Sequence, residues 1–86
     1  MYKVYLADKK VGKTLEKLSS PARESIQEAI LGLEKDPRPQ GTRMLSGKLK
    51  AAWRLRVGDY RILYDIEDQK RQVFILDIGH RREIYR

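Results

Sequence analysis

Arginine is the residue type in this sequence whose number and spacing could do chemistry. Arg54, Arg56 and Arg61 fall within eight residues, and a guanidinium can bind two oxygens of a phosphate at once. The segment from residue 37 to residue 58 contains no acidic residue, while its basic residues are Arg38, Arg43, Lys48, Lys50, Arg54 and Arg56. Positive charge gathered in this way predicts a binding site for phosphates. A surplus that served only solubility would not need to cluster.

The whole-chain composition agrees with a polyanionic partner. The 86 residues include 19 Lys and Arg against 12 Asp and Glu, a net charge of +7, which suits a nucleic acid, an anionic membrane or an acidic protein. With no cysteine and one histidine, we expect no disulfide, no metal site and no cofactor. Apolar runs such as Val73–Leu76 are too short to span a membrane, so we expect a cytoplasmic protein without membrane attachment.

Other groups able to take part in catalysis are few. His80 is the one side chain whose unperturbed pKa lies near neutrality, and Tyr85 could stack on a base or donate a proton. Neither a glycine-rich phosphate loop nor an ordered Ser, His and Asp set is present. The carboxylates of Asp65, Glu67 and Asp68 have the pattern of turn and rim charges. Any chemistry must therefore depend mainly on positive charge.

Hydrophobic periodicity predicts the elements that carry these groups. Apolar residues at helical spacing in the first half give way to alternating apolar residues in the second. We expect residues 1–86 to form a single α+β domain of order β-α-α-β-β-β, with an N-terminal helical hairpin packed on one face of an antiparallel sheet. The expected strands are residues 2–7, 51–57, 60–66 and 72–79, the expected helices follow Ala7 and Ser20, and residues 36–43 form a connecting loop.

The predicted hairpin between the strands of residues 51–57 and 60–66 determines which arginines lie opposite each other. Gly58-Asp59 is a signal for a two-residue turn, which sets Arg56 directly opposite Arg61. Like charges at opposed positions destabilise a sheet by roughly 0.2–1 kcal/mol. Arg54 lies two residues from Arg56 and so adds a third guanidinium to the same, partly open face. A bound phosphate would offset this repulsion.

Alternation along the last strand extends this face. Asp77, Gly79 and Arg81 are expected to point to one side, which is the side of Arg61 if the intervening turn allows it. A three-residue turn would put Asp77 opposite Arg61. The sequence leaves that register open.

Two motifs together resemble a known family. The run from Trp53 to Tyr64, WRLRVGDYRILY, and the ending from Ile78 to Tyr85, IGHRREIY, resemble the RelE/ParE superfamily of type II toxins, nearest to its RelE branch. The similarity extends to the N-terminal strand, the helical pair and the Leu45-Ser46-Gly47 segment, and so covers nearly the whole chain. It implies a toxin of a toxin–antitoxin module that enters the ribosomal A site and cleaves messenger RNA by attack of the 2′-OH on the adjacent phosphate.

The resemblance also implies residue roles and partners. By position it implies a catalytic set of Arg54, Arg56, Arg61, Arg81 and Tyr85, and around these we expect an RNA-binding set of Lys48, Lys50, His80 and Arg82. The partners it implies are a cognate antitoxin, the ribosome with its ribosomal RNA, and messenger RNA. No small-molecule cofactor is expected.

One departure from the family pattern leaves the proton acceptor open. Where the family has lysine, this chain has Arg54 and Arg56, which are always protonated and so make poor general bases. The base could be His80, or Tyr85 with its pKa lowered by neighbouring arginines, or no dedicated base exists. Two other functions also remain open on the sequence alone: a ParE-like poison of DNA gyrase and a catalytically inactive RNA-binding homologue.

Overall fold

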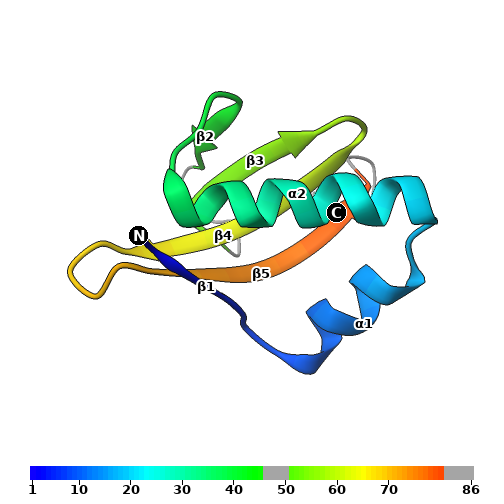
Figure 1. The fold of residues 1–86 in the computed structure, drawn as a ribbon, viewed down its shortest axis with the longest axis horizontal. Helices are drawn as coiled ribbons and strands as arrows, with labels where there is room; N and C mark the ends of the chain where they lie inside the picture. Colours follow the sequence, from blue (N-terminus) through cyan, green and yellow to red (C-terminus); the bar gives the residue numbers. More distant parts are fainter. Residues whose placement is uncertain (46–50, 81–86) are drawn as a thin grey trace.

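A computed structural model describes residues 1–45 and 51–80 of the chain. Seven elements follow one another, two helices after the first strand and four strands after the helices (Figure 1). They are β1 (Lys3–Leu6), α1 (Lys9–Lys17), α2 (Ser20–Lys35), β2 (Thr42–Met44), β3 (Trp53–Val57), β4 (Tyr60–Glu67) and β5 (Gln72–His80). This confirms the α+β class and the expected order, with one strand more than predicted.

The strands form one sheet in the order β1-β5-β4-β3-β2. The ladders from β2 to β5 are antiparallel, as expected, but β1 runs parallel to β5. The sheet is therefore mixed, which corrects the prediction of an antiparallel sheet. The sequence pattern did not indicate this direction, because no hairpin joins β1 to its neighbour and the two helices that follow it free the strand to pair either way.

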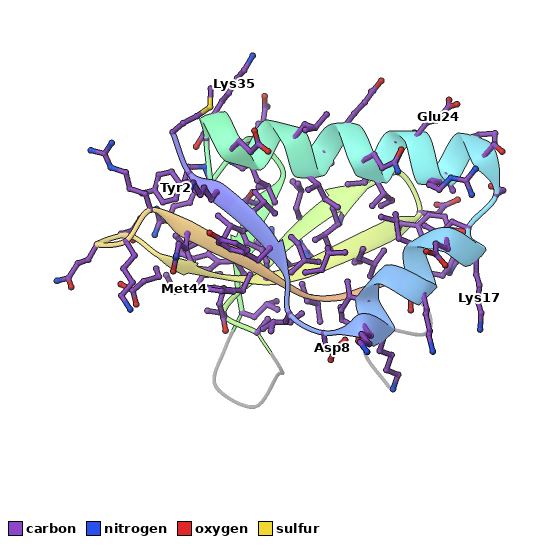
Figure 2. The ribbon with its side chains drawn as sticks, turned by 60° about the horizontal axis from the view of Figure 1, so that its bottom comes forward. Tyr2, Asp8, Lys17, Glu24, Lys35 and Met44 are labelled. Atoms are coloured by element: carbon purple, nitrogen blue, oxygen red, sulfur yellow. The ribbon has the colours of Figure 1, made fainter. Side chains whose placement is uncertain are left out.

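Both helices cover the same face of the sheet, where the hydrophobic core lies (Figure 1). Val11 of α1 and Ile26 and Leu33 of α2 are buried against this face. From the sheet the buried core residues are Leu55, Ile62, Tyr64, Val73, Ile75 and Ile78. In Figure 2, Glu24 and Lys35 point away from the sheet, as expected for the solvent side of an amphipathic helix.

The helix ends follow local sequence signals. The side chain of Asp8 accepts a hydrogen bond of 3.0 Å from the backbone N–H of Val11 and so caps the start of α1. The second helix begins at Ser20, so the cap position is Ser19, one residue before the expected Ser20, and proline lies in the first turn. It ends at Lys35, with Asp36 at the C-cap position directly before Pro37, where the sequence predicted the end of the helix.

A cluster of polar side chains ties three distant segments together at one end of the sheet. Asp68, in the β4–β5 turn, accepts a 2.7 Å hydrogen bond from the hydroxyl of Tyr2. The guanidinium of Arg38 binds both oxygens of the same carboxylate, at 3.1 and 2.7 Å. Arg38 also lies over the ring of Trp53, 4.8 Å from its centroid. The N-terminus, the α2–β2 loop and the β4–β5 turn are thus held by one carboxylate.

A buried tyrosine forms hydrogen bonds with the loop between α2 and β2 and with the start of β2. The hydroxyl of Tyr64, a fully buried residue, donates a 2.8 Å hydrogen bond to the carbonyl of Pro37 and lies 3.2 Å from the hydroxyl of Thr42. Burial raises the pKa of Tyr64, so the hydroxyl stays protonated as a donor. This contact leads the chain from the helix into β2.

We predict that Asp68→Asn lowers the thermal midpoint slightly at neutral pH. Hydrogen bonds from Arg38 and Tyr2 lower the pKa of Asp68 to about 2, below its ordinary value of 3.8. A lowered folded-state pKa contributes stability that is fully present above the unfolded value and is lost as the pH falls through the folded one. The difference in thermal midpoint between wild type and Asp68→Asn should therefore disappear as the pH falls from about 4 to about 2. Thermal melts followed by circular dichroism measure it.

A matched control for this measurement is Asp59→Asn, which removes an exposed carboxylate from the β3–β4 turn. It accounts for the general effect of one negative charge fewer on a basic protein. A gap for Asp68→Asn that stayed unchanged down to pH 2 would contradict the proposed role of its carboxylate.

Candidate functional site

The β3–β4 hairpin positions the central arginines. Gly58 occupies the first place of the two-residue turn with a φ of 59°, a conformation that glycine adopts without steric cost. The turn pairs Val57 with Tyr60 and sets Arg56 directly opposite Arg61. The predicted register and the predicted opposition of like charges are both confirmed.

Alternation along β3 puts Arg54 and Arg56 on the face of the sheet away from the helices, because Leu55 between them points into the core. The β2–β3 ladder adds Arg43, which lies opposite Arg54. Two cross-strand arginine pairs therefore occur on one face of three neighbouring strands, Arg43 with Arg54 and Arg56 with Arg61. Residues directly opposite in an antiparallel ladder have neighbouring side chains, so like charges face each other twice.

Arg61 differs from its partners in burial. Arg56 is exposed and Arg54 half-buried, but Arg61 is only 5% exposed, which corrects the expectation of an exposed guanidinium. One of its terminal nitrogens donates hydrogen bonds to the carbonyl of Tyr60 at 3.1 Å and, at 3.4 Å, to that of Gly58. Its Nε is buried and has no hydrogen-bond partner among the described residues. A buried cation with spare donor capacity favours an incoming anion.

The register of β5 settles where Asp77 lies. A bulge between Leu63 and Tyr64 shifts the β4–β5 pairing, so Asp77 pairs with Leu63 and Gly79 pairs with Arg61. The register that would have put Asp77 opposite Arg61 is wrong, because the longer turn and the bulge each shift the pairing by one residue. Asp77 is on the arginine side, as alternation predicted, but one step away along the strand. Gly79 contributes no side chain opposite the guanidinium.

His80 lies on the other face of the sheet. It pairs with Tyr60, and the two rings meet edge to face with centroids 5.7 Å apart. Because Tyr60 packs against the hydrophobic core, its cross-strand neighbour is on the helix side. The structure therefore does not bring His80 together with Arg56 and Arg61. A general base must reach the proton that it removes, so this placement disfavours His80 in that role.

A surface depression of about 340 Å³ lies beside the central arginines. The described residues that line it are Gly41, Thr42, Arg43, Arg54 and Arg56. Arg43 belongs to this site although sequence reasoning assigned it to a connecting loop. The signal that could have found it was its place in the acid-free segment, but a strand of three residues is too short to recognise by periodicity.

Five predicted site residues, Lys48, Lys50, Arg81, Arg82 and Tyr85, lie outside the described residues. Within residues 1–45 and 51–80, no group of three His, Cys, Asp or Glu side chains could hold a metal ion. In the same part of the chain, neither helix has the length and apolar character needed to cross a membrane. The chemistry that the described site offers is thus electrostatic, the binding and stabilisation of negative charge by arginine.

Comparison with known proteins adds what geometry alone does not. Residues 6–85 match the family described as the ParE toxin of the type II toxin-antitoxin system, parDE. The chain is 36% identical to toxin RelG of Mycobacterium tuberculosis over 73 residues, which cover 84% of this chain and 83% of RelG. This chain belongs to the RelE/ParE superfamily of type II toxins. The family expected from the two sequence motifs is confirmed.

Other relatives place this toxin near the RelE members of the superfamily. It is 28% identical over 80 residues to the mRNA interferase toxin RelE of Escherichia coli K12, covering 91% of this chain and 84% of that protein. Its fold matches the toxin in the archaeal RelE–RelB complex from Pyrococcus horikoshii with a TM-score of 0.81 and 28% identity, over 95% of this chain and 97% of that one.

We predict that Gly58→Ala destabilises this toxin by about 1 kcal/mol, since a Cβ at a φ of 59° is strained even though no atom lies within 4 Å of it. The matched control is Gly32→Ala, at an equally open position inside α2, which should raise stability by up to about 1 kcal/mol. Urea unfolding at unchanged m-value measures both. Equal effects at the two positions would contradict the role assigned to the turn.

Proposed function

We propose that this chain is the toxin of a type II toxin–antitoxin module and inhibits translation as a ribosome-dependent endoribonuclease that cleaves messenger RNA in the A site. The observation that carries the proposal is the opposition of Arg56 and Arg61 on one sheet face. Like charges held together by a turn are stabilised by an anion between them. The RelE relative named as an mRNA interferase supports messenger RNA as the source of that anion.

The proposed reaction is a transesterification within the RNA strand. The ribose 2′-oxygen forms a bond to the adjacent phosphorus, and the bond from phosphorus to the 5′-oxygen of the next nucleotide breaks. The 2′-hydroxyl loses a proton and the leaving 5′-oxygen gains one, which yields a 2′,3′-cyclic phosphate and a 5′-hydroxyl. The pentacoordinate transition state carries more negative charge than the substrate phosphate, so fixed cations lower its free energy.

The arginines are suited to stabilising that charge. Arg61 is held in place by hydrogen bonds to the carbonyls of Gly58 and Tyr60, and its buried Nε has no hydrogen-bond partner among the described residues. A donor fixed in this way needs little reorganisation in the transition state. Arg56 is exposed and can close on the phosphate from the neighbouring strand. Arg54 extends the positive face, and we assign Arg81 and Tyr85 to the same site on the strength of the family resemblance.

The proton acceptor is the role that the described residues fill least well. A guanidinium does not act as a proton acceptor in proteins, which excludes Arg54 and Arg56, and the ring of His80 lies on the helix side of the sheet. Tyr85 therefore remains as the candidate base, or the reaction proceeds without a dedicated one. An enzyme that supplies mainly positive charge needs its substrate held in line for attack, and this is the reason to propose that the ribosome takes part.

We predict that Arg61→Ala reduces messenger RNA cleavage on ribosomes by roughly 10²–10³-fold, as expected for loss of a fixed donor to a developing oxyanion. Arg56→Ala should cost less, about tenfold or ~1.4 kcal/mol, because its side chain is exposed and less well fixed. Primer extension after induction in bacteria, followed by assays with purified ribosomes, measures both losses.

The control variant is Lys13→Ala, which removes one positive charge from the exposed surface of α1. Arg56→Ala also guards against misfolding of Arg61→Ala, since truncating an exposed residue leaves the core intact. Full cleavage by both arginine variants would exclude the assigned site. Equal cleavage of free and ribosome-bound messenger RNA would exclude ribosome dependence.

A second candidate function follows from the name of the matching family. The family that matches residues 6–85 is described as the ParE toxin, so the alternative is a toxin that poisons DNA gyrase through protein contacts. Such a toxin has no need of opposed arginines on an RNA-binding face. Supercoiling and cleavage-complex assays with purified protein decide the question: gyrase inhibition at stoichiometric toxin, without RNA cleavage on ribosomes, would favour the alternative.

We further propose a cognate antitoxin as the partner of this toxin. The similar archaeal structure is a complex of RelE with RelB, and a toxin of net charge +7 suits an acidic partner. We predict that co-expression of the neighbouring open reading frame restores growth of bacteria that express the toxin. A frameshifted version of the same reading frame is the control, and equal growth arrest with both would contradict the proposal.

A further inference from the structure

The sheet face that carries Arg43, Arg54, Arg56 and Arg61, here called the arginine face, extends further along the strands than the binding of one phosphate requires. Arg43 lies opposite Arg54 in the β2–β3 ladder, just as Arg56 lies opposite Arg61 in the β3–β4 ladder. Along β3 the two pairs are two residues apart, which corresponds to about 7 Å at the usual rise per residue. This separation is of the same order as the spacing of successive phosphates along an RNA strand.

An open depression lies beside Arg43 and Arg54, and its described lining carries no acidic group. The depression of about 340 Å³ is lined, among the described residues, by Arg43, Arg54 and Arg56 together with Gly41 and Thr42, and none of these is acidic. The side chain of Arg43 is exposed, so no rearrangement of the fold is needed for an anion to reach it. The structure thus offers a second position in which two guanidinium groups can share one anion.

We propose that Arg43 and Arg54 form a second phosphate subsite, which binds the phosphate next to the scissile one in the RNA strand. This inference rests on the proposed function and deepens it, because it assigns a substrate contact to Arg43. The occupant is RNA rather than an acidic protein segment, since the described lining contains no large apolar side chain that could anchor a peptide. A phosphodiester strand needs only evenly spaced cations.

The first test measures binding of a short oligoribonucleotide that carries 2′-deoxyribose at the cleavage position and so cannot be cut. Arg43→Gln should weaken binding about tenfold in 0.1 M salt and reduce the slope of log affinity against log salt by about 0.7, the loss of one phosphate contact. Arg43→Lys should keep most of the slope, because the charge remains. The control Lys13→Gln, on the helix side, should change the slope little.

The second test identifies the phosphate. Neutral methylphosphonates are placed one at a time on either side of the cleavage position. For wild type, one of them should weaken binding by the same factor as Arg43→Gln. Combined with Arg43→Gln, that methylphosphonate should cause no further loss, because the contact is already gone. Additive losses at both positions, or a slope for Arg43→Gln equal to that of Lys13→Gln, would overturn the subsite.

The outcomes distinguish failure of the proposed phosphate subsite from failure of the proposed endoribonuclease function. Binding that depends on Arg43 supports the subsite even if wild type fails to cleave messenger RNA on ribosomes, a result that would reject the proposed function alone. Normal RNA binding by Arg43→Gln with weakened capture of the antitoxin would overturn the subsite and assign the residue to a protein interface. Thermal melts should give Arg43→Gln a midpoint no lower than that of wild type, since it removes a repulsive pair.

Discussion

The repulsion between Arg56 and Arg61 is the constraint on which the site depends. A two-residue turn with Gly58 at positive φ fixes the register, and that register forces the two guanidinium groups onto opposed positions. The free protein pays roughly 0.2–1 kcal/mol for such a pair, a cost that an apolar or mixed pair would not carry. An anion between them turns the same geometry from a destabilising contact into a preformed binding site.

The fold carries this cost because the opposite face of the same strands builds the core. Leu55, Ile62 and Tyr64 alternate with the arginine positions and are buried beneath the helices. Strict alternation means that a one-residue slip would expose the core residues and bury several guanidinium groups. Burial of the hydrophobic face therefore stabilises this register, although repulsion on the charged face alone would disfavour it. Packing on the helix side of the sheet thus offsets the repulsion between Arg56 and Arg61.

Local signals predicted the parts of the structure that depend on neighbouring residues. The turn at Gly58, the end of α2 before Pro37 and the opposition of Arg56 and Arg61 could all be derived from the sequence. Features set by pairing between distant segments could not: the parallel direction of β1, the short edge strand β2 and the bulge that shifts β5. The burial of Arg61 depends on packing between distant segments, so it too escaped prediction.

The division between the two faces also bears on catalysis. Arginine keeps its charge at every physiological pH, so a face built from arginine binds phosphate without being able to accept a proton. Compared with lysine, arginine at positions 54 and 56 favours bidentate phosphate binding but offers no group whose pKa could be tuned toward neutrality. The ring of His80 meets that of Tyr60 edge to face on the helix side of the sheet. The described arginine side is therefore better suited to stabilising negative charge than to accepting a proton. Under the proposed function, the remaining requirement is that the 2′-hydroxyl be held in line with the phosphate, which is the role proposed for the ribosome.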